Sequence, residues 1–287
     1  MRMHNADETC GIAQAAVVLG DWWNVLVLRE IARGHVRFDA LATEIGLSRK
    51  VLTERLGRLV ALGVLRRVLY QRRPVRYEYL LTHAGQALLP VLVAMQDWGD
   101  RWVLGDGSPA ATAAEGGAEH TRAHALAGTR VPDGLVLPAA DGTDRDVVSP
   151  EGATVLFAYP GTGVEWDEPI PGAVGCTLEN RLFGDAWPRF QEAGVELRGT
   201  STQLPREQAE FARAESVPYP LLSDARHQLA AALRLPTFRG VGRLRHKRLI
   251  LVIDAERTVR HVLFPVLDIP QAVERSLSLA ATCARTS

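Results

Sequence analysis

Two patterns of hydrophobic and polar positions divide the chain. In the first hundred residues, apolar side chains recur every three or four positions, which is the spacing of helices that bury one face. Further on, continuous apolar runs alternate with helical patterns, and this alternation predicts an α/β sandwich. Residues 105–130 lie between the two patterns and consist largely of Gly, Ala, Ser, Thr and His. We therefore expect two domains, residues 1–104 and 131–287, joined by a flexible linker over 105–130.

The first domain is predicted to be mainly helical. Asp21 and Ser48 are placed to cap helices, and Gly46 to end one. The expected helices cover Ile12–Leu19, a segment from Asp21 to Ile31, Phe38–Ile45, a segment from Ser48 to Leu62, and His83 to about Val103. The β-prone stretches Leu65–Tyr70 and Arg76–Leu81 flank Gln71-Arg72-Arg73-Pro74, which predicts a hairpin with a basic tip. This order of elements is the plan of a winged helix-turn-helix domain.

The second domain is predicted to alternate strands and helices. The expected strands are Val155–Tyr159, Val195–Thr200, Leu249–Asp254 and Val259–Phe264. The expected helices are Glu179–Glu192, Pro205–Ser216, Arg226–Arg234 and Pro270–Thr282. Helices that follow strands in this way cover the faces of one central sheet.

The formal net charge is zero, but the charges are unevenly distributed. Residues 1–103 carry 14 basic and 10 acidic residues, and residues 49–76 carry nine basic residues and one acidic residue, Glu54. Such a block suits a phosphate-facing surface, although a solvated basic face has the same composition. No apolar run approaches the ~20 residues that span a bilayer, and residues 1–9 lack a signal core. We expect a cytoplasmic protein with no membrane partner.

The segment after Ser48 carries what a DNA-reading helix needs. Leu52, Leu56 and Leu59 share one face, and the opposite face is basic, so that it can enter the major groove. Arginines of the hairpin, with Arg66 and Arg67 among them, can lie along the phosphate backbone. The candidate DNA-binding residues are Ser48, Arg49, Lys50, Thr53, Arg55, Arg58, Arg72, Arg73 and Arg76.

Several sequence motifs within residues 8–103 resemble those of the HxlR-type winged helix-turn-helix regulators. The resemblance lies in Trp23-x2-Leu26-x-Leu28-Arg29-Glu30-Ile31, Leu47-Ser48-Arg49-Lys50-Val51-Leu52-Thr53 and Tyr77-Glu78-Tyr79-x-Leu81-Thr82. It implies binding of double-stranded operator DNA by a homodimer whose core is built from the terminal helices. The resemblance also implies a redox sensor at Cys10, although Gly11 replaces the Pro that usually follows this cysteine. Alternatively, Cys10 is a position inherited from the family without a sensing role.

Cys176 is the candidate reactive residue of the second domain. The other cysteines, Cys10 and Cys283, are too far away in the sequence to suggest a disulfide scaffold or a CxxC metal pair. Cys176 lies where the helix over Glu179–Glu192 is expected to begin. Backbone N–H groups and the helix dipole there lower a thiol pKa and favour thiolate, which attacks peroxides. The alternative is an inert cysteine in a domain used for ligand binding or dimerisation.

Around this cysteine the sequence resembles a peroxiredoxin, a redoxin with the thioredoxin fold. The resemblance spans 131–282 and lies in Tyr159-Pro160-Gly161-Thr162-Gly163, Gly175-Cys176-Thr177, Pro220-Leu221-Leu222-Ser223-Asp224 and Lys247-Arg248-Leu249-Ile250-Leu251-Val252-Ile253-Asp254. It implies that Cys176 attacks peroxide and becomes a sulfenic acid, and that Arg248 stabilises the thiolate. Thr162 would hydrogen-bond peroxide or thiolate, and Pro160 would shield the pocket. The partner would be a thiol reductant, either thioredoxin-like or a small thiol, and no cofactor is implied.

Two departures from the peroxiredoxin pattern affect the expected chemistry. Residues Val164–Val174 are an insertion before Cys176, and Arg181 stands where bacterioferritin-comigratory-type relatives often place a resolving cysteine. The cycle would therefore use Cys10, Cys283 or an external thiol, and Cys283 can also be a tail thiol without a role. No metal is expected, because His120 and His124 stand in the linker without a further ligand nearby.

Three functions remain open on the sequence. The preferred one is a DNA-binding transcription regulator modulated by oxidation of Cys176. The alternative is a thiol peroxidase whose fused DNA-binding domain localises it or autoregulates its gene. The third is a constitutive regulator whose redoxin half only strengthens dimerisation. The predicted fold is a mainly-α winged helix-turn-helix domain followed by an α/β thioredoxin-like sandwich of the peroxiredoxin type.

Overall fold

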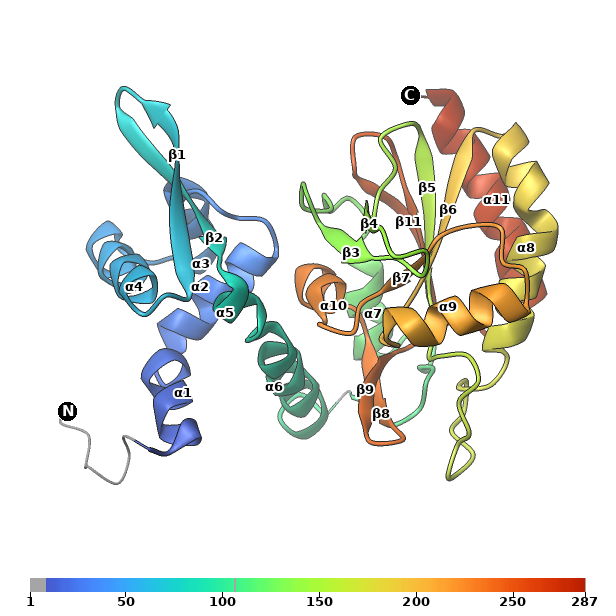
Figure 1. Cartoon of the computed structure of the whole chain (residues 1–287), viewed down its shortest axis with the longest axis horizontal. Coiled ribbons are helices and arrows are strands. Elements are labelled where there is room, and N and C mark those ends of the chain that lie inside the picture. The colour runs from blue at the N-terminus through green and yellow to red at the C-terminus, as the bar shows by residue number, and fades with distance from the viewer. Residues whose placement is uncertain (1–8, 106, 287) are drawn as a thin grey trace. The chain divides into compact units, whose positions relative to one another are not determined.

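The computed structural model describes residues 9–105 and 107–286. The chain forms two compact units, Met1–Leu92 and Val93–Ser287, and each is described by itself. The first is mainly helical and the second is an α/β sandwich, which confirms the predicted fold class (Figure 1). No single helix among the described residues is long and apolar enough to cross a membrane, and only a bent pair, Gly11–Leu19 with Trp22–Ala32, meets that test by length and composition.

In the described part of the first unit, four helices precede a hairpin. These are α1 (Gly11–Leu19), α2 (Trp22–Ala32), α3 (Phe38–Ile45), α4 (Arg49–Ala61), β1 (Leu65–Arg72) and β2 (Val75–Leu81). Asp21 accepts from the N–H of Trp23, Ser48 accepts from the N–H of Val51, and Gly46 ends α3 at a φ of 71°. The predicted caps are therefore confirmed. Apolar faces of α2, α3 and α4 close on one core that includes Leu28, Leu41, Leu52, Leu56 and Leu59.

The helix predicted from His83 to Val103 is wrong as a single element. The chain forms α5 (His83–Gln86), breaks, and restarts as α6 (Leu89–Trp102). Pro90 has no N–H to donate, and within a continuous helix its ring would clash with the carbonyl of Gln86. At the second position of a new helix the missing donor costs nothing, so the break lies just before Pro90.

The second unit is built around a five-stranded sheet in the order β11-β10-β5-β6-β7. Strands β5 (Ala153–Ala158), β6 (Val195–Ser201) and β7 (Leu221–Ser223) are parallel, whereas β10 (Leu249–Ile253) is antiparallel to β5 and to β11 (Val259–Leu263). Two hairpins lie outside this sheet. They are β3 (Val136–Pro138) with β4 (Asp144–Asp146), and β8 (Thr237–Gly240) with β9 (Arg243–His246).

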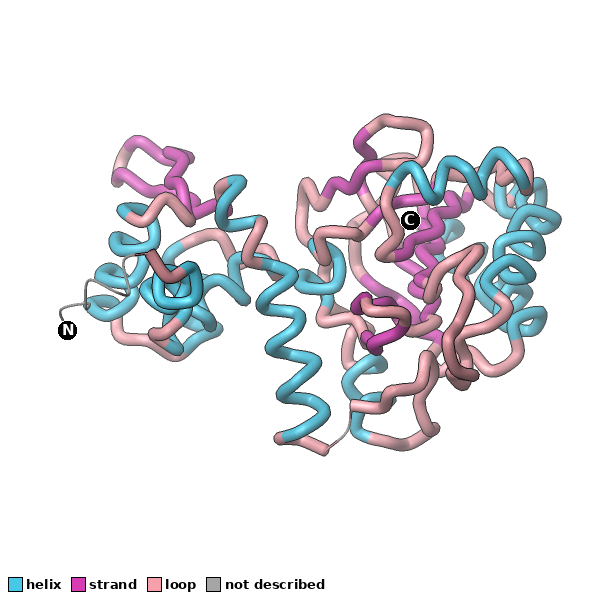
Figure 2. The backbone as a smooth tube through the Cα atoms, turned by 60° about the horizontal axis from the view of Figure 1, so that its bottom comes forward, coloured by secondary structure: helices cyan, strands magenta, loops and turns pink. Residues whose placement is uncertain are grey.

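Helices cover both faces of this sheet (Figure 2). On one face α8 (Cys176–Glu192) and α11 (Ile269–Thr286) pack on a core that includes Phe157, Phe183 and Val273. On the other face, α7 (Ala118–His124), α10 (Gln228–Leu233) and the β3–β4 hairpin enclose a second core that includes Leu156 and Leu229. Helix α9 (Pro205–Ala214) packs beside β7. Strand β5 is buried along its whole length because both faces are covered.

Residues 105–130 differ from the flexible linker expected there. They include α7, and Ala123 and Leu126 belong to the core beneath it. The fully buried Lys247 donates to the Glu119 carboxylate over 2.7 Å and to the carbonyl oxygens of Ser108 and Thr112. A segment with few large side chains is thus held by an ion pair and backbone contacts, which composition does not reveal. The limits of the domains at residues 104 and 131 stay predictions, and the structural division falls between Leu92 and Val93.

Candidate functional site

Cys176 is the first residue of α8, and its side chain is buried. The preceding residue, Gly175, has a φ of 95°, a conformation that favours glycine, and a Cβ there would meet Ile269 Cδ1 at 2.9 Å. The chain can therefore turn sharply into the helix and leave the sulfur facing the core of the unit. The thiol donates to the carbonyl oxygen of Ala173, which lies 3.5 Å from Sγ.

Arg248 lies against the sulfur, as the resemblance implied. Its Nη2 is 3.4 Å from Sγ, and its Nε donates to Glu179 Oε2 over 2.8 Å. The carbonyl oxygens of Gly172 and Val174 accept its remaining donors, each over 3.0 Å. Arg248 is 4% exposed, so its charge acts in a poorly solvated site where it interacts strongly with both neighbours.

The thiol pKa is raised, so the expected lowering is wrong for this arrangement. Burial raises the pKa of the Cys176 thiol to about 11. The charge of Arg248 and a backbone hydrogen bond from Gly161 act to lower this pKa, but burial outweighs them. The Glu179 carboxylate raises it further. Burial also raises the pKa of Glu179 to about 7, despite the charge and hydrogen bond of Arg248. A helix N-terminus favours thiolate only where the sulfur remains partly solvated, and here desolvation dominates.

Thr162 and Pro160 lie near the thiol in different settings. The N–H of Thr162 donates to Gln203 Oε1 over 2.8 Å, and its hydroxyl is 3.3 Å from the same oxygen. The carbonyl oxygen of Pro160 accepts from Arg245 Nη1 over 3.2 Å. The hydroxyl of Thr162 is thus engaged by Gln203, and the roles expected for Thr162 and Pro160 in holding or shielding a peroxide stay predictions.

Three side chains at this site were missed by the sequence reasoning. Glu179 was recognisable, because it stands three residues after Cys176 on a helix and so shares its face. Arg245 belongs to the run Arg245-His246-Lys247-Arg248, of which only the last residue was singled out. Gln203 carries no local signal, since its contact with Thr162 joins loops 41 residues apart.

The other two cysteines lie away from this arrangement. No disulfide joins the three cysteines of the described structure. Cys283 is buried on α11 in the core that α8 and α11 share, so it is not a loose tail thiol, and burial raises its pKa. Cys10 is exposed just before α1 in the first unit. At the position of the absent resolving cysteine, Arg181 forms an exposed ion pair with Glu215.

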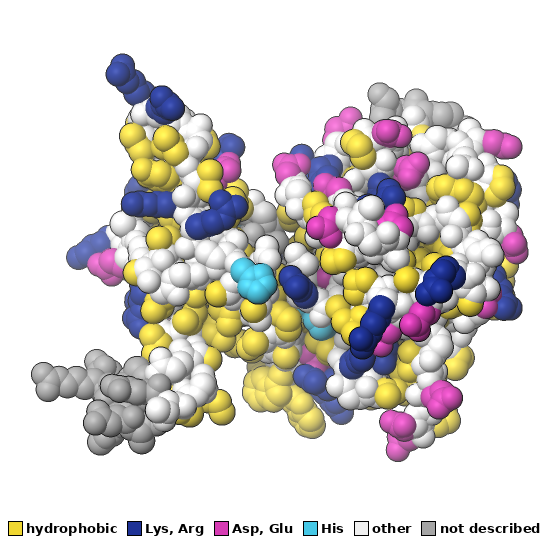
Figure 3. Space-filling view, in the orientation of Figure 1, with side chains coloured by type: hydrophobic (Ala, Val, Ile, Leu, Met, Phe, Trp, Pro, Cys, Tyr) yellow, Lys and Arg dark blue, Asp and Glu magenta, His cyan; other side chains and the backbone are white. Residues whose placement is uncertain are grey.

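The first unit presents a candidate nucleic-acid interface on α4 and the β1–β2 hairpin. Lys50 and Thr53 are exposed on α4, as predicted. Lys and Arg side chains gather at the tip of the hairpin, and Arg72 and Arg73 are exposed (Figure 3). Among the described residues, no ion pair at or below 4.0 Å involves the following basic side chains: Lys50, Arg66, Arg67, Arg72 and Arg73.

Some of the predicted DNA-binding residues are engaged within the unit. Arg55 is half-buried against Asp21, with 3.0 Å between Nη2 and Oδ2, which ties α4 to the start of α2. Arg49 and Arg76 both lie beside Asp39, at 2.9 Å and 3.6 Å, on exposed surface where phosphate can compete. Arg58 donates to the carbonyl oxygen of Val17. The structure thus gives Arg55 a structural contact that its helical position did not suggest.

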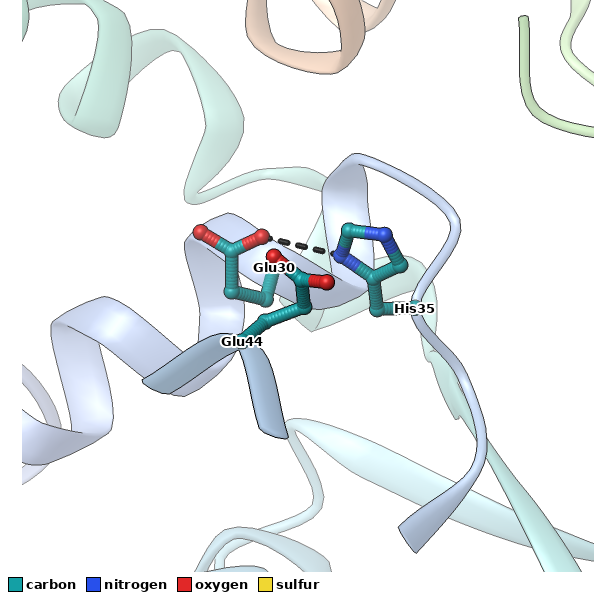
Figure 4. Close-up of side chains that lie close together, drawn as sticks. All are labelled: Glu30, His35 and Glu44. Atoms are coloured by element: carbon teal, nitrogen blue, oxygen red, sulfur yellow. Dashed lines mark hydrogen bonds and ion pairs between the residues drawn. The ribbon is translucent and has the colours of Figure 1, made fainter. Parts of the chain in front are cut away.

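Glu30, His35 and Glu44 form a cluster with metal-ligand chemistry (Figure 4). Glu30 Oε1 already accepts from Arg29 and Arg33, and Oε2 is 2.9 Å from His35 Nδ1. Although burial acts to raise it, the hydrogen bond of His35 and the charges of Arg33 and Arg29 hold the pKa of Glu30 below its ordinary value. Both oxygens are committed, and the cluster is best described as an ion-pair network that holds the end of α2.

Two family models match the chain in succession. Residues 18–106 match the HxlR-like helix-turn-helix family, and residues 127–262 match the AhpC/TSA family. A Bacillus subtilis protein named as an HTH-type transcriptional regulator is 36% identical over 101 residues, which are 34% of this chain and 94% of that protein. A Mycobacterium tuberculosis protein with a peroxiredoxin name is 34% identical over 146 residues, which are 50% of this chain and 88% of that protein. The chain belongs to both families.

Other similar proteins follow the same division. An HTH-type transcriptional regulator of Mycobacterium tuberculosis is 40% identical over 92 residues, which are 32% of this chain but only 58% of that regulator. The crystal structure of peroxidoxin BcpB from Mycobacterium tuberculosis is 32% identical, with a TM-score of 0.47, and covers 54% of this chain and 96% of its own. An HxlR helix-turn-helix region and a peroxiredoxin-like region are thus fused in one chain.

Proposed function

We propose that this chain is a DNA-binding regulator whose affinity for operator DNA changes when Cys176 is oxidised. The observation that carries the proposal is the contact between Cys176 Sγ and Arg248 in a chain that also has an HxlR-type helix-turn-helix. In the proposed step the sulfur attacks the terminal oxygen of a hydroperoxide and the O–O bond breaks. A sulfenic acid forms on Cys176 and the alcohol leaves with the second oxygen.

DNA binding is proposed for the exposed basic side chains of α4 and the β1–β2 hairpin. Lys50 and Thr53 are exposed on α4 and are assigned to a groove, while the exposed Arg72 and Arg73 of the hairpin are assigned to phosphate. Ser48 shapes the start of α4, and we assign Arg55 to holding the helix rather than to contacting DNA. Arg49, Arg58 and Arg76 would bind phosphate after exchanging their present exposed partners.

Removal of the hairpin arginines tests this assignment. We expect Arg72→Ala with Arg73→Ala to weaken binding to duplex from upstream of its own gene by about tenfold or more at low salt, with a shallower salt dependence. Arg189→Ala is the matched control, because Arg189 is an exposed arginine of α8 in the second unit. Fluorescence anisotropy across salt concentrations measures both quantities. Equal affinity of the hairpin variant and the control would contradict the assignment.

A homodimer is also proposed. Helix α6 leaves large apolar side chains exposed, and an exposed surface of this kind is typical of an association face. These side chains are Met95, Trp98 and Trp102. A second copy is the proposed occupant, since residues 18–106, which include α6, match the HxlR-like family, and the resemblance to HxlR-type regulators implies a homodimer. Trp98→Glu with Trp102→Glu is expected to give a monomer in sedimentation measurements, and an unchanged dimer would contradict the proposal.

A route from the thiol to the rest of the chain is supported by contacts within the second unit. Asp97 and Asp100 on the second half of α6 pair with Arg239 at 3.2 Å and Arg234 at 2.9 Å. Arg239 lies on the β8–β9 hairpin, which also carries Arg245 beside Pro160. A change in the thiol pocket can therefore alter how α6 is held, and α6 begins in the first unit at Leu89.

The redox half of the proposal is tested by DNA binding before and after peroxide. We expect hydrogen peroxide to change the affinity of the wild-type chain and a thiol reductant to restore it. Cys176→Ser should bind DNA but fail to respond. If mass spectrometry shows that Cys176 is oxidised and the affinity for DNA is nevertheless unchanged, redox control is contradicted. The chain would then be a constitutive regulator.

A thiol peroxidase is the second candidate, favoured by the same Cys176–Arg248 contact. It requires a reducing thiol, either thioredoxin-like or small, to return the sulfenic acid to thiol in each cycle. Continuous peroxide consumption with thioredoxin or dithiothreitol decides between the two. Turnover above that of Cys176→Ser supports an enzyme, whereas a single equivalent consumed supports a sensor.

A further inference from the structure

An open hollow of about 550 Å³ lies on the second unit beside the thiol loop. Its wall is formed by the 162–167 loop, the start of α9 and the β8–β9 hairpin. The lining side chains used below are Thr162, Gln203, Glu207, Arg243 and Arg245. Thr162, Gln203 and Arg245 are all at least nine-tenths buried, so the polar floor is part of the fold rather than a set of loose surface groups.

Arg245 is a buried cation without a carboxylate partner. It is 4% exposed, and its printed hydrogen bonds go to the carbonyl oxygens of Gly240 and Pro160. Its guanidinium also lies over the ring of Trp166, 5.3 Å from the centroid. Within the described residues no carboxylate lies within 4.0 Å of it, and burial lowers its pKa. An uncompensated buried charge in the wall of a hollow is a site for an anion.

The other charged residues that line the hollow indicate how many negative charges a bound anion carries. Arg243 at the rim is paired with Glu207 at 3.2 Å, so these two side chains neutralise each other. Glu165 and Asp167 also line the hollow, but both side chains are exposed and solvent screens them. Arg245 is the buried charge of the lining without an opposite partner. The hollow therefore suits a group with a single negative charge, such as a carboxylate, better than a doubly charged phosphate.

Gly161 places this anion site next to the sulfur. Its backbone N–H hydrogen-bonds to Cys176, and a Cβ added to it would lie 2.9 Å from Arg245 Nη1 and 3.3 Å from the side-chain amide carbon of Gln203. Its φ of 147° also favours glycine. The absent side chain thus leaves Arg245 and Gln203 close to the backbone that contacts the thiol.

We propose that this hollow binds the carboxylate of an organic hydroperoxide whose peroxide end reacts at Cys176. Arg245 is the specificity-determining residue and Gln203 its polar neighbour. The inference rests on the proposed reaction of Cys176 with hydroperoxides and adds the class of oxidant. The thiol and the hydroperoxide are converted to a sulfenic acid and an alcohol, and the carboxylate is unchanged.

The test compares a charged and an uncharged oxidant on the full chain. The probes are 3-hydroperoxy-3-methylbutanoic acid and its methyl ester, and the measurement is the rate of sulfenic acid formation at Cys176, trapped with dimedone. Rates are divided by those of free cysteine to remove intrinsic reactivity. We expect a preference for the acid of about tenfold, the size of one charge-assisted hydrogen bond.

Variants separate recognition from a structural role. Arg245→Met should bring the acid-to-ester ratio to about one, and Arg245→Lys should retain part of the preference. Arg206→Met is the control, because Arg206 is an exposed arginine on α9 that does not line the hollow. If Arg245→Met merely loosened the Pro160 loop, both rates would fall and the ratio would stay. A wild-type ratio of one, or an unchanged ratio in Arg245→Met, overturns the inference.

A competition experiment covers the case in which Arg245→Met does not fold. On the wild-type chain, 3-hydroxy-3-methylbutanoate should slow oxidation of Cys176 by hydrogen peroxide, while its methyl ester should not. Equal effects of the two compounds count against the anion site. If hydrogen peroxide itself leaves Cys176 unmodified, the proposed function fails first and the inference falls with it, so the two failures are distinguishable.

Discussion

At the scale of single residues, Arg248 has one positive charge and two acidic neighbours. It contacts Cys176 Sγ at 3.4 Å and Glu179 Oε2 at 2.8 Å, and all three side chains are buried. The carboxylate is the nearer and, at neutral pH, the more readily ionised partner. When Glu179 is neutral, the charge of Arg248 therefore stabilises the Cys176 thiolate more strongly. The protonation states of Glu179 and Cys176 are coupled for this reason.

Glu179→Gln tests this competition. The neutral amide can still accept from Arg248 Nε, but it removes the negative charge that raises the pKa of Cys176. We expect the thiol pKa to fall and alkylation by iodoacetamide at neutral pH to become about fivefold to tenfold faster. Glu274→Gln, which removes an exposed carboxylate of α11, is the control. Slower alkylation of Glu179→Gln than of the control would show that Glu179 helps rather than hinders thiolate formation.

The same carboxyl group predicts a pH dependence of stability. Burial raises the pKa of Glu179 from 4.5 to about 7, so between these values the folded state binds a proton that the unfolded state has lost. Stability is therefore greater at low pH and declines as pH rises through about 7, by up to about 3 kcal/mol. The difference in unfolding free energy between wild type and Glu179→Gln, measured with urea across this range, should follow that slope. A difference independent of pH would contradict the raised pKa.

Sequence reasoning identified the residues of this site that depend on local position. Cys176 and Arg248 were identified through the resemblance to peroxiredoxins, and hydrophobic patterning placed Cys176 near the start of a helix and Arg248 before a strand. The direction of the thiol pKa could not be obtained in that way, because it depends on how completely α8 and α11 cover the sulfur. Gln203 and Arg245 were missed for a related reason, since loops brought together by the sheet place them beside Thr162 and Pro160.

At the scale of elements, α7 shows how a polar segment can be fixed to a fold. Lys247, between β9 and β10, is fully buried, and Glu119 on α7 is 6% exposed. Burial lowers the pKa of Lys247 and raises that of Glu119, yet their contact at 2.7 Å favours the ionised pair. The pair thus joins a segment with few apolar side chains to the residues just before β10 of the central sheet.

Removing one member of this pair should destabilise the second unit strongly. Lys247→Met leaves a buried carboxylate without its cation, and we expect a loss of about 3–5 kcal/mol in urea unfolding. Lys247→Met with Glu119→Leu should recover most of that loss, since an apolar pair of similar volume has no charge to desolvate. Arg130→Met, in the exposed pair with Asp133, should cost less than about 1 kcal/mol. A double variant as unstable as the single one would contradict this account.

Strands of five or more residues were predicted, and strands of three or four residues were not. Strands β5, β6, β10 and β11 and helices α8, α9 and α11 carry enough apolar positions to show their period. The β8–β9 hairpin was missed because each of its strands has only four residues. Its turn also lacks the Asn-Gly or Asp-Gly pair that usually marks a hairpin, and Val241 adopts a φ of 48° there instead. That hairpin carries Arg245, so the missed element explains the missed residue.

At the scale of the whole molecule, the division between units falls inside a helix. The sequence predicted the two families in the right order, and the structural division between Leu92 and Val93 lies within α6, while the predicted domain limit at residue 104 stays a prediction. An amphipathic pattern shows that a face is buried without showing what buries it. Leu88 and Leu92 pack in the core of the first unit, whereas Val93 packs with Ala230 and Leu244 in the second. One continuous helix thus contributes residues to a cluster in each unit.

If α6 transmits the oxidation of Cys176, loosening its contacts in the second unit should separate the two activities. Asp97→Asn with Asp100→Asn removes the charges that pair with Arg239 and Arg234, while Cys176, Arg245 and Arg248 stay intact. We expect Cys176 to react with peroxide at the wild-type rate, and reduced protein to bind DNA as wild type does. The ratio of affinities between oxidised and reduced protein, about fivefold or more for wild type, should fall towards one. Anisotropy titrations measure the ratio, with Glu274→Gln as a control for loss of a carboxylate. If the double asparagine variant kept the full response, coupling would have to run through other contacts of the second unit, because the ion pairs of α6 would then be only structural.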